Sequence, residues 1–470
     1  MRLGTGMRLR ATRRAQERQY VQVEAEGVEA AGECAAGAWA WVLEQVRWDS
    51  QGPWVPTAVP SSGDSPPGPP EDRDCLYDGI GGVALALGEI KLAREWTEDE
   101  RRLADGIVSR LSVADAGGEC GLYTGLAGNL VAVAVLAPTV STGLLDRLAD
   151  VATPTGWASA IFDDPPSPIN DLIMGNAGVV LTCAWLGGER ADGLAALGAD
   201  ALVASAIPAP HGLSWKMYQG DRDRVMPNYS HGTAGIATAL AVAGHRLRRP
   251  DLVEAARLGA QHLVALADLD DAGFRLPLQV PQAEDREPYA YGWCHGPTGT
   301  AQLFGALALA GVTSVAGRSC TEWMDRAARS VQASGLPTRL RPGFWDNDGR
   351  CCGTAGVLNA TLNRAQGTGD ATHLRFAGRL AAALVDRAVR SPADDDLCYW
   401  RFHEHRVDPP ELDPGVGWMQ GAAGIASALA RYARIRDRGL ATLSLSLPDD
   451  WWMGIGSHRP EPKAKGPSEG

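Results

Sequence analysis

The sequence predicts an all-α protein of the α/α toroid class, with seven inner helices and about seven outer helices. Three observations lead to this prediction: a glycine motif recurs seven times, an apolar stretch follows each motif, and a more amphipathic stretch precedes each one. The leading glycines of the motif are Gly79, Gly125, Gly175, Gly232, Gly296, Gly353 and Gly421.

Each motif holds two glycines three residues apart, as in HGTAGIATAL from His231 and QGAAGIASAL from Gln420. Glycine at a helix entry lets the chain turn tightly and lets two backbones approach closely. It also leaves free N–H groups at the positive end of the helix dipole. Each motif therefore predicts the start of an apolar inner helix, and function is expected at the residue just before each leading glycine.

The stretches between the motifs predict the outer helices. PDLVEAARLGAQHLVALADL, from Pro250, places apolar residues on one helical stripe. These are Leu252, Ala255, Ala256, Ala260, Leu263 and Leu266. Two helices per repeat suit an inner and an outer ring. An open solenoid is the alternative, but open arrays have shorter and more regular repeats, which favours a closed ring.

Residues 28–455 are predicted to form a single toroid domain, which includes a Pro-rich loop at residues 54–74. Residues 1–27 form an Arg-rich extension that is expected to be flexible, and residues 456–470 are expected to be disordered.

Composition narrows the classes of function. The chain has 470 residues, of which 45% are hydrophobic, and a formal net charge of −12, which argues against nucleic acid as a partner. The N-terminus lacks the apolar core of a signal peptide, and no apolar run is long enough to span a membrane. These features predict a cytoplasmic protein, in which the nine cysteines are structural, metal-binding or catalytic rather than bridged.

Metal-competent residues head repeats four to six. His231 and His295 immediately precede leading glycines, Cys294 precedes His295, and Cys351 and Cys352 are adjacent. Three protein ligands with an open fourth position are the pattern of a catalytic zinc site, whereas structural sites are closed by four. The three cysteines therefore predict one Zn²⁺ per chain, and the other six cysteines are interpreted as buried small residues.

Four segments resemble the lanthionine synthetase C-like cyclases: WCHGPTG from Trp293, CCG from Cys351, SHGTAG from Ser230 and NDLIMGNAG from Asn170. The resemblance spans nearly the whole chain. It implies zinc-dependent cyclisation of a dehydrated precursor peptide, in which a cysteine thiol adds to dehydroalanine or dehydrobutyrine and forms a lanthionine or methyllanthionine ring.

The resemblance also implies residue roles. Cys294, Cys351 and Cys352 match the zinc ligands of the family's three-cysteine subgroup. His231 matches the active-site histidine, suited to protonating the enolate. Asp171 matches the aspartate of an Asp-x-Ile-x-Gly motif and would orient His231 or a water, although a helix-capping role is the alternative.

The chain departs from the family in two places. Many members have histidine where this chain has Cys352, and the added negative charge is expected to make a bound thiolate more nucleophilic. Several cyclases have an arginine where Ala290 stands, and Arg350 is a candidate replacement. His295, beside a ligand, is interpreted either as a second proton donor or as a group that supports the ligands.

Two other functions remain open: addition of glutathione or another thiol to dehydroamino acids, and a non-catalytic, zinc-stabilised peptide-binding scaffold. A sugar- or terpene-processing toroid is disfavoured, because the acidic clusters at Asp163 and Asp394 do not head repeats. The expected partners are the dehydrated precursor peptide and a separate dehydratase or kinase-like enzyme. The sequence leaves open whether the protein joins a membrane-associated complex.

Overall fold

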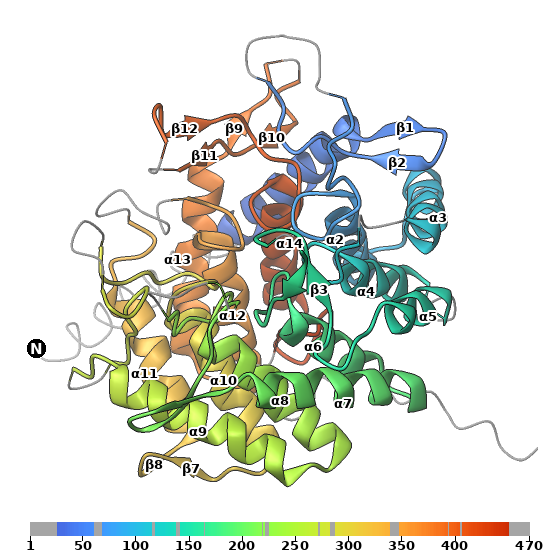
Figure 1. Cartoon of the computed structure of the whole chain (residues 1–470). Coiled ribbons are helices and arrows are strands. Elements are labelled where there is room, and N and C mark those ends of the chain that lie inside the picture. Colours follow the sequence, from blue (N-terminus) through green and yellow to red (C-terminus); the bar gives the residue numbers. More distant parts are fainter. Residues whose placement is uncertain are drawn as a thin grey trace, which may run out of the picture.

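The structure of the protein, a computed structural model, is mostly helical (Figure 1). It describes residues 26–60, 68–114, 118–137, 142–163, 165–218, 220, 225–270, 273–282, 287–338, 347–392, 394–404 and 407–450.

Seven inner helices begin at the seven glycine motifs, with the leading glycine as the N-cap residue each time. They are α2 (Ile80–Ala93), α4 (Leu126–Leu136), α6 (Asn176–Leu186), α8 (Thr233–Leu247), α10 (Pro297–Leu309), α12 (Thr354–Thr368) and α14 (Ala422–Arg438). Most residues of each inner helix are buried on all sides, which explains the nearly continuous apolar sequences that follow the motifs.

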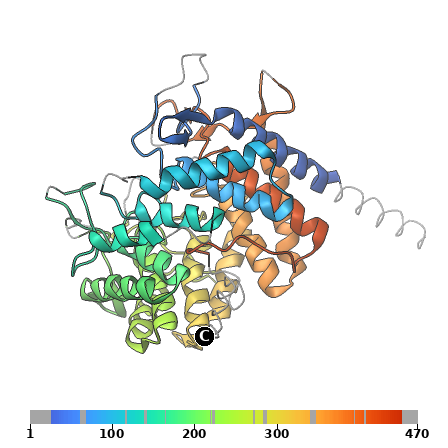
Figure 2. The same cartoon turned by 90° about the vertical axis from the view of Figure 1, so that its right-hand side faces the viewer.

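Seven outer helices surround them. They are the helix over residues 26–45 and α3 (Glu98–Val113), α5 (Thr142–Asp150), α7 (Glu189–Ala204), α9 (Pro250–Leu266), α11 (Cys320–Ala333) and α13 (Ala371–Arg387). In α9 the apolar stripe expected from the sequence is turned inwards, with Leu252, Ala256 and Leu263 buried. The helix over residues 26–45 lies beside α14 (Figure 2).

The ring is closed, as the sequence predicted. Each inner helix packs against the next, and the last, α14, packs against the first, α2. Backbone hydrogen bonds between the loops that precede the inner helices also run around the whole ring. In each of these bonds the first residue donates its N–H to the carbonyl of the second: Tyr77 to Tyr123, Tyr123 to Ile173, Leu172 to Ser230, Ser230 to Cys294, Cys294 to Cys351, Cys351 to Met419, and Met419 to Tyr77.

The second glycine of each motif is required by the close approach of the preceding loop. A Cβ atom at Gly299 would lie 1.8 Å from the Trp293 carbonyl oxygen, and one at Gly424 would lie 1.8 Å from the Trp418 carbonyl oxygen. The corresponding glycines in the other five repeats meet a loop carbonyl within 2.6 Å. No side chain fits at such separations, so the glycine pair is a packing requirement of the fold.

Short antiparallel hairpins join the helices. Their paired strands are β1 (Arg47–Asp49) with β2 (Gly52–Trp54), β3 (Ala158–Ser159) with β4 (Ser167–Pro168), β5 (Ile207–Ala209) with β6 (Gly212–Ser214), β7 (Ser314–Val315) with β8 (Arg318–Ser319), β9 (Val389–Arg390) with β10 (Cys398–Tyr399), and β11 (Phe402–His403) with β12 (Glu411–Leu412). The indoles of Trp157, Trp215 and Trp400 each donate to a carbonyl near the end of the preceding outer helix (2.8 Å each).

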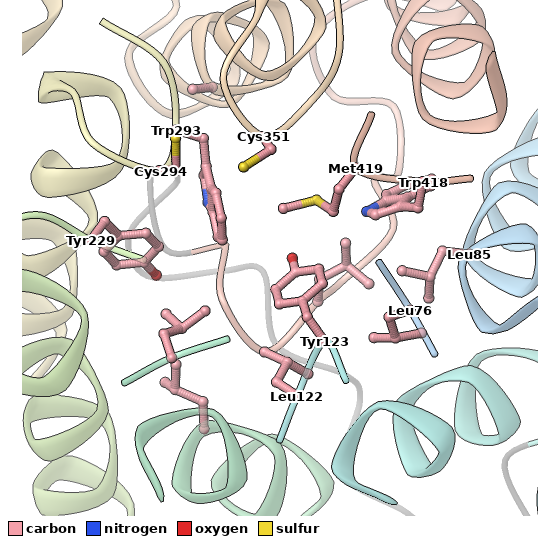
Figure 3. Close-up of a cluster of buried hydrophobic side chains, with 14 of the residues drawn as sticks. Leu76, Leu85, Leu122, Tyr123, Tyr229, Trp293, Cys294, Cys351, Trp418 and Met419 are labelled. Carbon is pink, nitrogen blue, oxygen red and sulfur yellow. The ribbon is translucent and has the colours of Figure 1, made fainter. Parts of the chain in front are cut away.

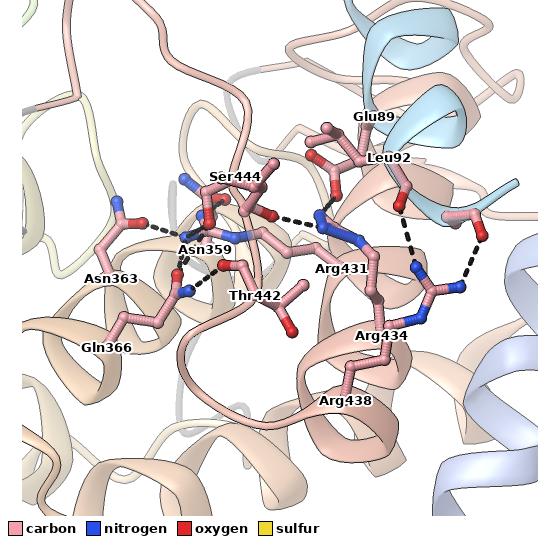
Figure 4. A network of polar contacts seen from close by, with 12 residues as sticks. Glu89, Leu92, Asn359, Asn363, Gln366, Arg431, Arg434, Arg438, Thr442 and Ser444 are labelled. Carbon is pink, nitrogen blue, oxygen red and sulfur yellow. Dashed lines mark hydrogen bonds and ion pairs between the residues drawn. The ribbon is translucent and has the colours of Figure 1, made fainter. Parts of the chain in front are cut away.

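The segment after α14, residues 439–450, turns back into the middle of the ring. Gln366 in α12 donates to the carbonyls of Leu440 and Thr442 (2.9 and 2.8 Å), and Trp185 in α6 donates to Ser446 (3.0 Å). Arg431 binds Asn359 (2.6 Å), Asn363 and Gln366 in α12 as well as Ser444, as Figure 4 shows. This segment therefore fills the bore of the toroid.

Parts of the expected domain organisation lie outside the described residues, namely the extension up to residue 25, the tail at residues 456–470 and the stretch 61–67 of the Pro-rich loop. The domain limits 28 and 455 stay a prediction. No helix in the part of the chain that the structure describes is long and apolar enough to cross a membrane.

Candidate metal centre and active site

Three buried cysteines meet where the loops before α10 and α12 lie side by side. The Sγ atom of Cys352 is 3.2 Å from that of Cys294 and 3.5 Å from that of Cys351, and the three sulfur atoms lie within 4.8 Å of one another. Figure 3 shows Cys294 and Cys351 on neighbouring loops beside the aromatic cluster of Tyr123, Tyr229 and Trp293. The structure thus brings together all three residues that the sequence predicted as zinc ligands.

The spacing of the sulfur atoms fits a zinc ion. Tetrahedral zinc with Zn–S bonds of about 2.3 Å places its sulfur ligands about 3.8 Å apart. The two observed separations are only slightly shorter. Hydrogen bonds from Cys294 and Cys352 hold the pKa of the Cys351 thiol well below its usual range, whereas burial raises the pKa of Cys294. Because the thiolate is the form that binds metal, a lowered pKa suits Cys351 to the role of a ligand.

Tyr77 contacts the three-cysteine centre, and the sequence analysis did not predict this residue. Its hydroxyl hydrogen-bonds Cys351, and Nε2 of Gln420 donates to the same hydroxyl (2.8 Å). Burial, reinforced by the neighbouring cysteines, raises the pKa of Tyr77 well above its usual value, so the phenol keeps its proton and donates it to the thiolate.

A positional signal could have found Tyr77. It stands two residues before the leading glycine of its repeat, as Cys294 and Cys351 do in theirs. The expectation that function sits only at the residue immediately before the glycine was therefore too narrow. The residue two positions before the glycine accepts a backbone bond of the ring in every repeat, and in two repeats it is one of the three cysteines.

His231 and Asp171 form a pair next to the cysteines. Nδ1 of His231 lies 2.6 Å from Oδ2 of Asp171, which is fully buried, while the histidine side chain is one-quarter exposed. The other carboxylate oxygen of Asp171 accepts from the backbone N–H of Met174 (2.8 Å). Asp171 does not cap the following helix, because the N-cap residue is Gly175 and no side chain caps it.

His295 links the pair to the cysteines. Its ring lies 5.9 Å from the ring of His231, tilted by 58°, and its charge lowers the pKa of Cys351. The backbone N–H of Ser230, beside His231, donates to the Cys294 carbonyl (3.0 Å). The histidines and the three cysteines therefore form one continuous site.

The structure places Arg350, the candidate for the arginine that several cyclases have at the position of Ala290, in the bore of the toroid. Its guanidinium lies 4.1 Å from the centre of the Trp418 ring, inside the bore, and lines a small cavity with Asp449 and Asp450. Burial lowers the pKa of Arg350. Arg350 thus belongs to the polar interior beneath the loops.

A toroid of seven helix pairs, with a three-cysteine centre and a histidine–aspartate pair on the loops at one end, defines the class of protein. The family model for lanthionine synthetase C-like proteins matches residues 70–437, and the chain belongs to this family. No curated protein sequence matches the chain.

Among solved structures, a nisin cyclase has a similar fold, with 14% identity and a TM-score of 0.54 over 77% of this chain and 89% of that chain. A UGL variant with dGlcA-Glc-Rha-Glc has 13% identity and a TM-score of 0.40, covering 91% of this chain and 99% of that chain. A GH76 alpha-mannanase of Bacteroides thetaiotaomicron has 10% identity and a TM-score of 0.38, covering 78% and 88%.

Proposed function

We propose that the protein is a zinc-dependent cyclase that closes thioether rings in a dehydrated peptide. The observation that carries this proposal is the cluster of three cysteine sulfur atoms within 4.8 Å of one another, beside the His231–Asp171 pair. Cys294, Cys351 and Cys352 would hold one Zn²⁺ and leave its fourth position to the substrate thiol. Membership of the lanthionine synthetase C-like family supports the same interpretation.

When bound, the zinc ion would lower the pKa of an incoming thiol so that it ionises at neutral pH. His231 suits the proton transfer that remains. With Nδ1–H donating to Asp171, Nε2 is free to accept the thiol proton and to deliver it to the α-carbon. The S–Cβ bond forms, the Cα=Cβ double bond is lost and the sulfur proton ends on Cα, so the mass of the peptide is unchanged.

Asp171 would act as a positioning residue in this scheme. Because it is buried and tied to the Met174 backbone, it fixes the tautomer and the direction of the His231 ring. His295, whose ring lies 5.9 Å from that of His231, is proposed as a second proton donor. The substrate would come from a separate dehydratase or kinase-like enzyme.

Two measurements test the proposal. Metal analysis of the purified protein should give one zinc per chain, and replacing Cys351 and Cys352 together by alanine should remove it. Incubation with a dehydrated, cysteine-containing peptide should make its thiols resistant to alkylation while the peptide mass stays constant.

His231→Ala should keep the zinc and slow the reaction by about 10²- to 10⁴-fold, the usual contribution of general acid–base catalysis. His211→Ala is the control, because His211 lies exposed at the turn between β5 and β6. Full activity of His231→Ala would refute its role. Consumption of glutathione in preference to the peptide thiol would indicate a thiol transferase, and zinc binding without thiol consumption would indicate a scaffold.

A further inference from the structure

A large cavity lies over the first two repeats. Its volume is about 870 Å³, and it is bounded by the loop at residues 71–75, the end of α3 and the start of α4. It shares no residue with the three cysteines or with the His231–Asp171 pair. The cavity is therefore separate from the proposed cyclisation site, and ligand binding in it does not depend on that function.

The wall of this cavity contains buried polar atoms without partners. Asn129 is 1% exposed, and neither its carboxamide oxygen nor its nitrogen has a hydrogen-bond partner among the described residues. Oε2 of Glu119 and Oγ1 of Thr124 are likewise unpartnered in the same part of the chain. Unsatisfied buried polar groups destabilise a fold, so such a cluster calls for an explanation.

Asn129 is also an exception among the repeats. It stands four residues after the leading glycine, where the other six repeats have β-branched residues: Val83, Val179, Ile236, Thr300, Val357 and Ile425. The hydroxyl of Thr300 is satisfied within its own helix by the Gly296 carbonyl (3.1 Å). Asn129 has no such bond, and it is one of the residues that line the cavity.

The charge of the cavity favours a cationic ligand. Four carboxylates line it, from Glu71, Asp72, Asp74 and Glu119, against two guanidinium groups. One of these, Arg110, is already bound by Asp74 and by Asp49 (3.1 Å). The cavity therefore retains a net negative charge.

The rim of the cavity is apolar. Val113 is 76% exposed and Ile161 is 45% exposed, and both line the cavity. Exposed apolar side chains next to carboxylates suit the aliphatic stem and the charged end of lysine or arginine. A carboxamide with a free donor and a free acceptor suits a peptide group, which offers one of each.

We propose that this cavity binds a peptide segment that carries a lysine or arginine side chain. The basic side chain lies along Val113 and Ile161 with its cation at Glu119, and the peptide backbone pairs with Asn129. The cavity thereby selects peptides by a basic residue that is remote from the three-cysteine centre.

Calorimetric titration of the zinc-loaded full-length protein tests the proposal with three probes. Acetyl-Gly-Arg-Gly-amide should bind saturably, and acetyl-Gly-Gln-Gly-amide should bind at least tenfold more weakly. Butylguanidine has the single cation without the peptide groups and should also bind at least tenfold more weakly. Equal binding of the arginine and glutamine peptides would refute the role of the cation, and binding of butylguanidine as tight as that of the arginine peptide would refute the role of the peptide groups.

Asn129→Val gives this position the residue found in three other repeats. This variant should unfold at a higher temperature and bind the arginine peptide at least tenfold more weakly. Thr182→Val is the matched control, because the buried Thr182 hydroxyl is unpartnered but lies outside the cavity. It should be stabilised without any change in binding. Unchanged binding by Asn129→Val, or no binding by the unmodified protein at millimolar peptide, would overturn the proposal.

Discussion

Replacing Asp449 by asparagine is expected to stabilise the protein at neutral pH, and the gain is expected to shrink as the pH falls towards 4. The carboxyl group lies in the bore of the toroid and accepts a hydrogen bond from the Tyr123 hydroxyl (2.8 Å). Burial, together with the charge of Asp450, raises the pKa of Asp449 from its ordinary 3.8 to about 6. An asparagine of almost the same shape can still accept from Tyr123 but never carries the charge.

A carboxyl group whose pKa is raised by folding holds its proton more tightly in the folded state than in the unfolded state. The stabilisation of the folded state that this proton provides is fully present below pH 3.8 and is lost as the pH rises through 6. A rise from 3.8 to about 6, at about 1.36 kcal/mol for each pH unit, corresponds to about 3 kcal/mol. Asp449→Asn should therefore gain up to about 3 kcal/mol over the unmodified protein between pH 4 and pH 7.

Urea unfolding of the two proteins at a series of pH values from 4.5 to 7.5 measures this difference, because the titration of all shared groups cancels. Asp437→Asn is the control, because the Asp437 side chain is 76% exposed and lies outside the bore. A stability difference for Asp449→Asn that does not change with pH, or a loss of stability at pH 7.5, would contradict the reasoning.

Three further changes test other parts of the structure. Tyr77→Phe removes the hydrogen bond to the neighbouring thiolate, so zinc affinity in a chelator competition should fall about 10- to 100-fold; unchanged affinity would argue against this contact. Gly299→Ala forces a methyl group onto a loop carbonyl and should lower the free energy of unfolding by at least about 3 kcal/mol, whereas Gly193→Ala, with open space around it, should be neutral or stabilising. Burial alone would raise the pKa of Glu100, but hydrogen bonds led by the one from Arg94 lower it to about 2. Glu100→Gln should therefore destabilise the protein at pH 7. In the same urea assay, the difference in the free energy of unfolding between the two proteins should shrink as the pH falls from 4.5 towards 2.

Much of the fold could be predicted from the sequence because its repeats are local. Each glycine pair is required by a contact within its own repeat, so the pattern survives in the sequence even though the helices differ in length. The contact of Gly299 with the Trp293 carbonyl spans only six residues, for example. The three cysteines were predictable for a related reason, since Cys351 and Cys352 are adjacent and Cys294 has the same place in its own repeat.

The filling of the bore could not be predicted in this way. Residues 439–450 show no helical or strand periodicity, and their place depends on partners far away in the chain. Asp449 contacts Tyr123 and Tyr229, which lie more than 200 residues earlier, and no local pattern marks such a contact. The Asp171–His231 bond joins repeats three and four, so the sequence could suggest the two residues but not their separation.

The backbone hydrogen bonds between the loops before the inner helices close the toroid and also position two of the candidate metal ligands. The carbonyl and N–H of Cys294 and Cys351 are both used in bonds to neighbouring repeats, so these residues are fixed at both polar groups of the main chain. Their sulfur atoms are therefore held together by the closure of the toroid itself. One of these bonds joins the two residues directly, from the N–H of Cys294 to the carbonyl of Cys351, so the candidate metal centre lies on the loops that close the ring.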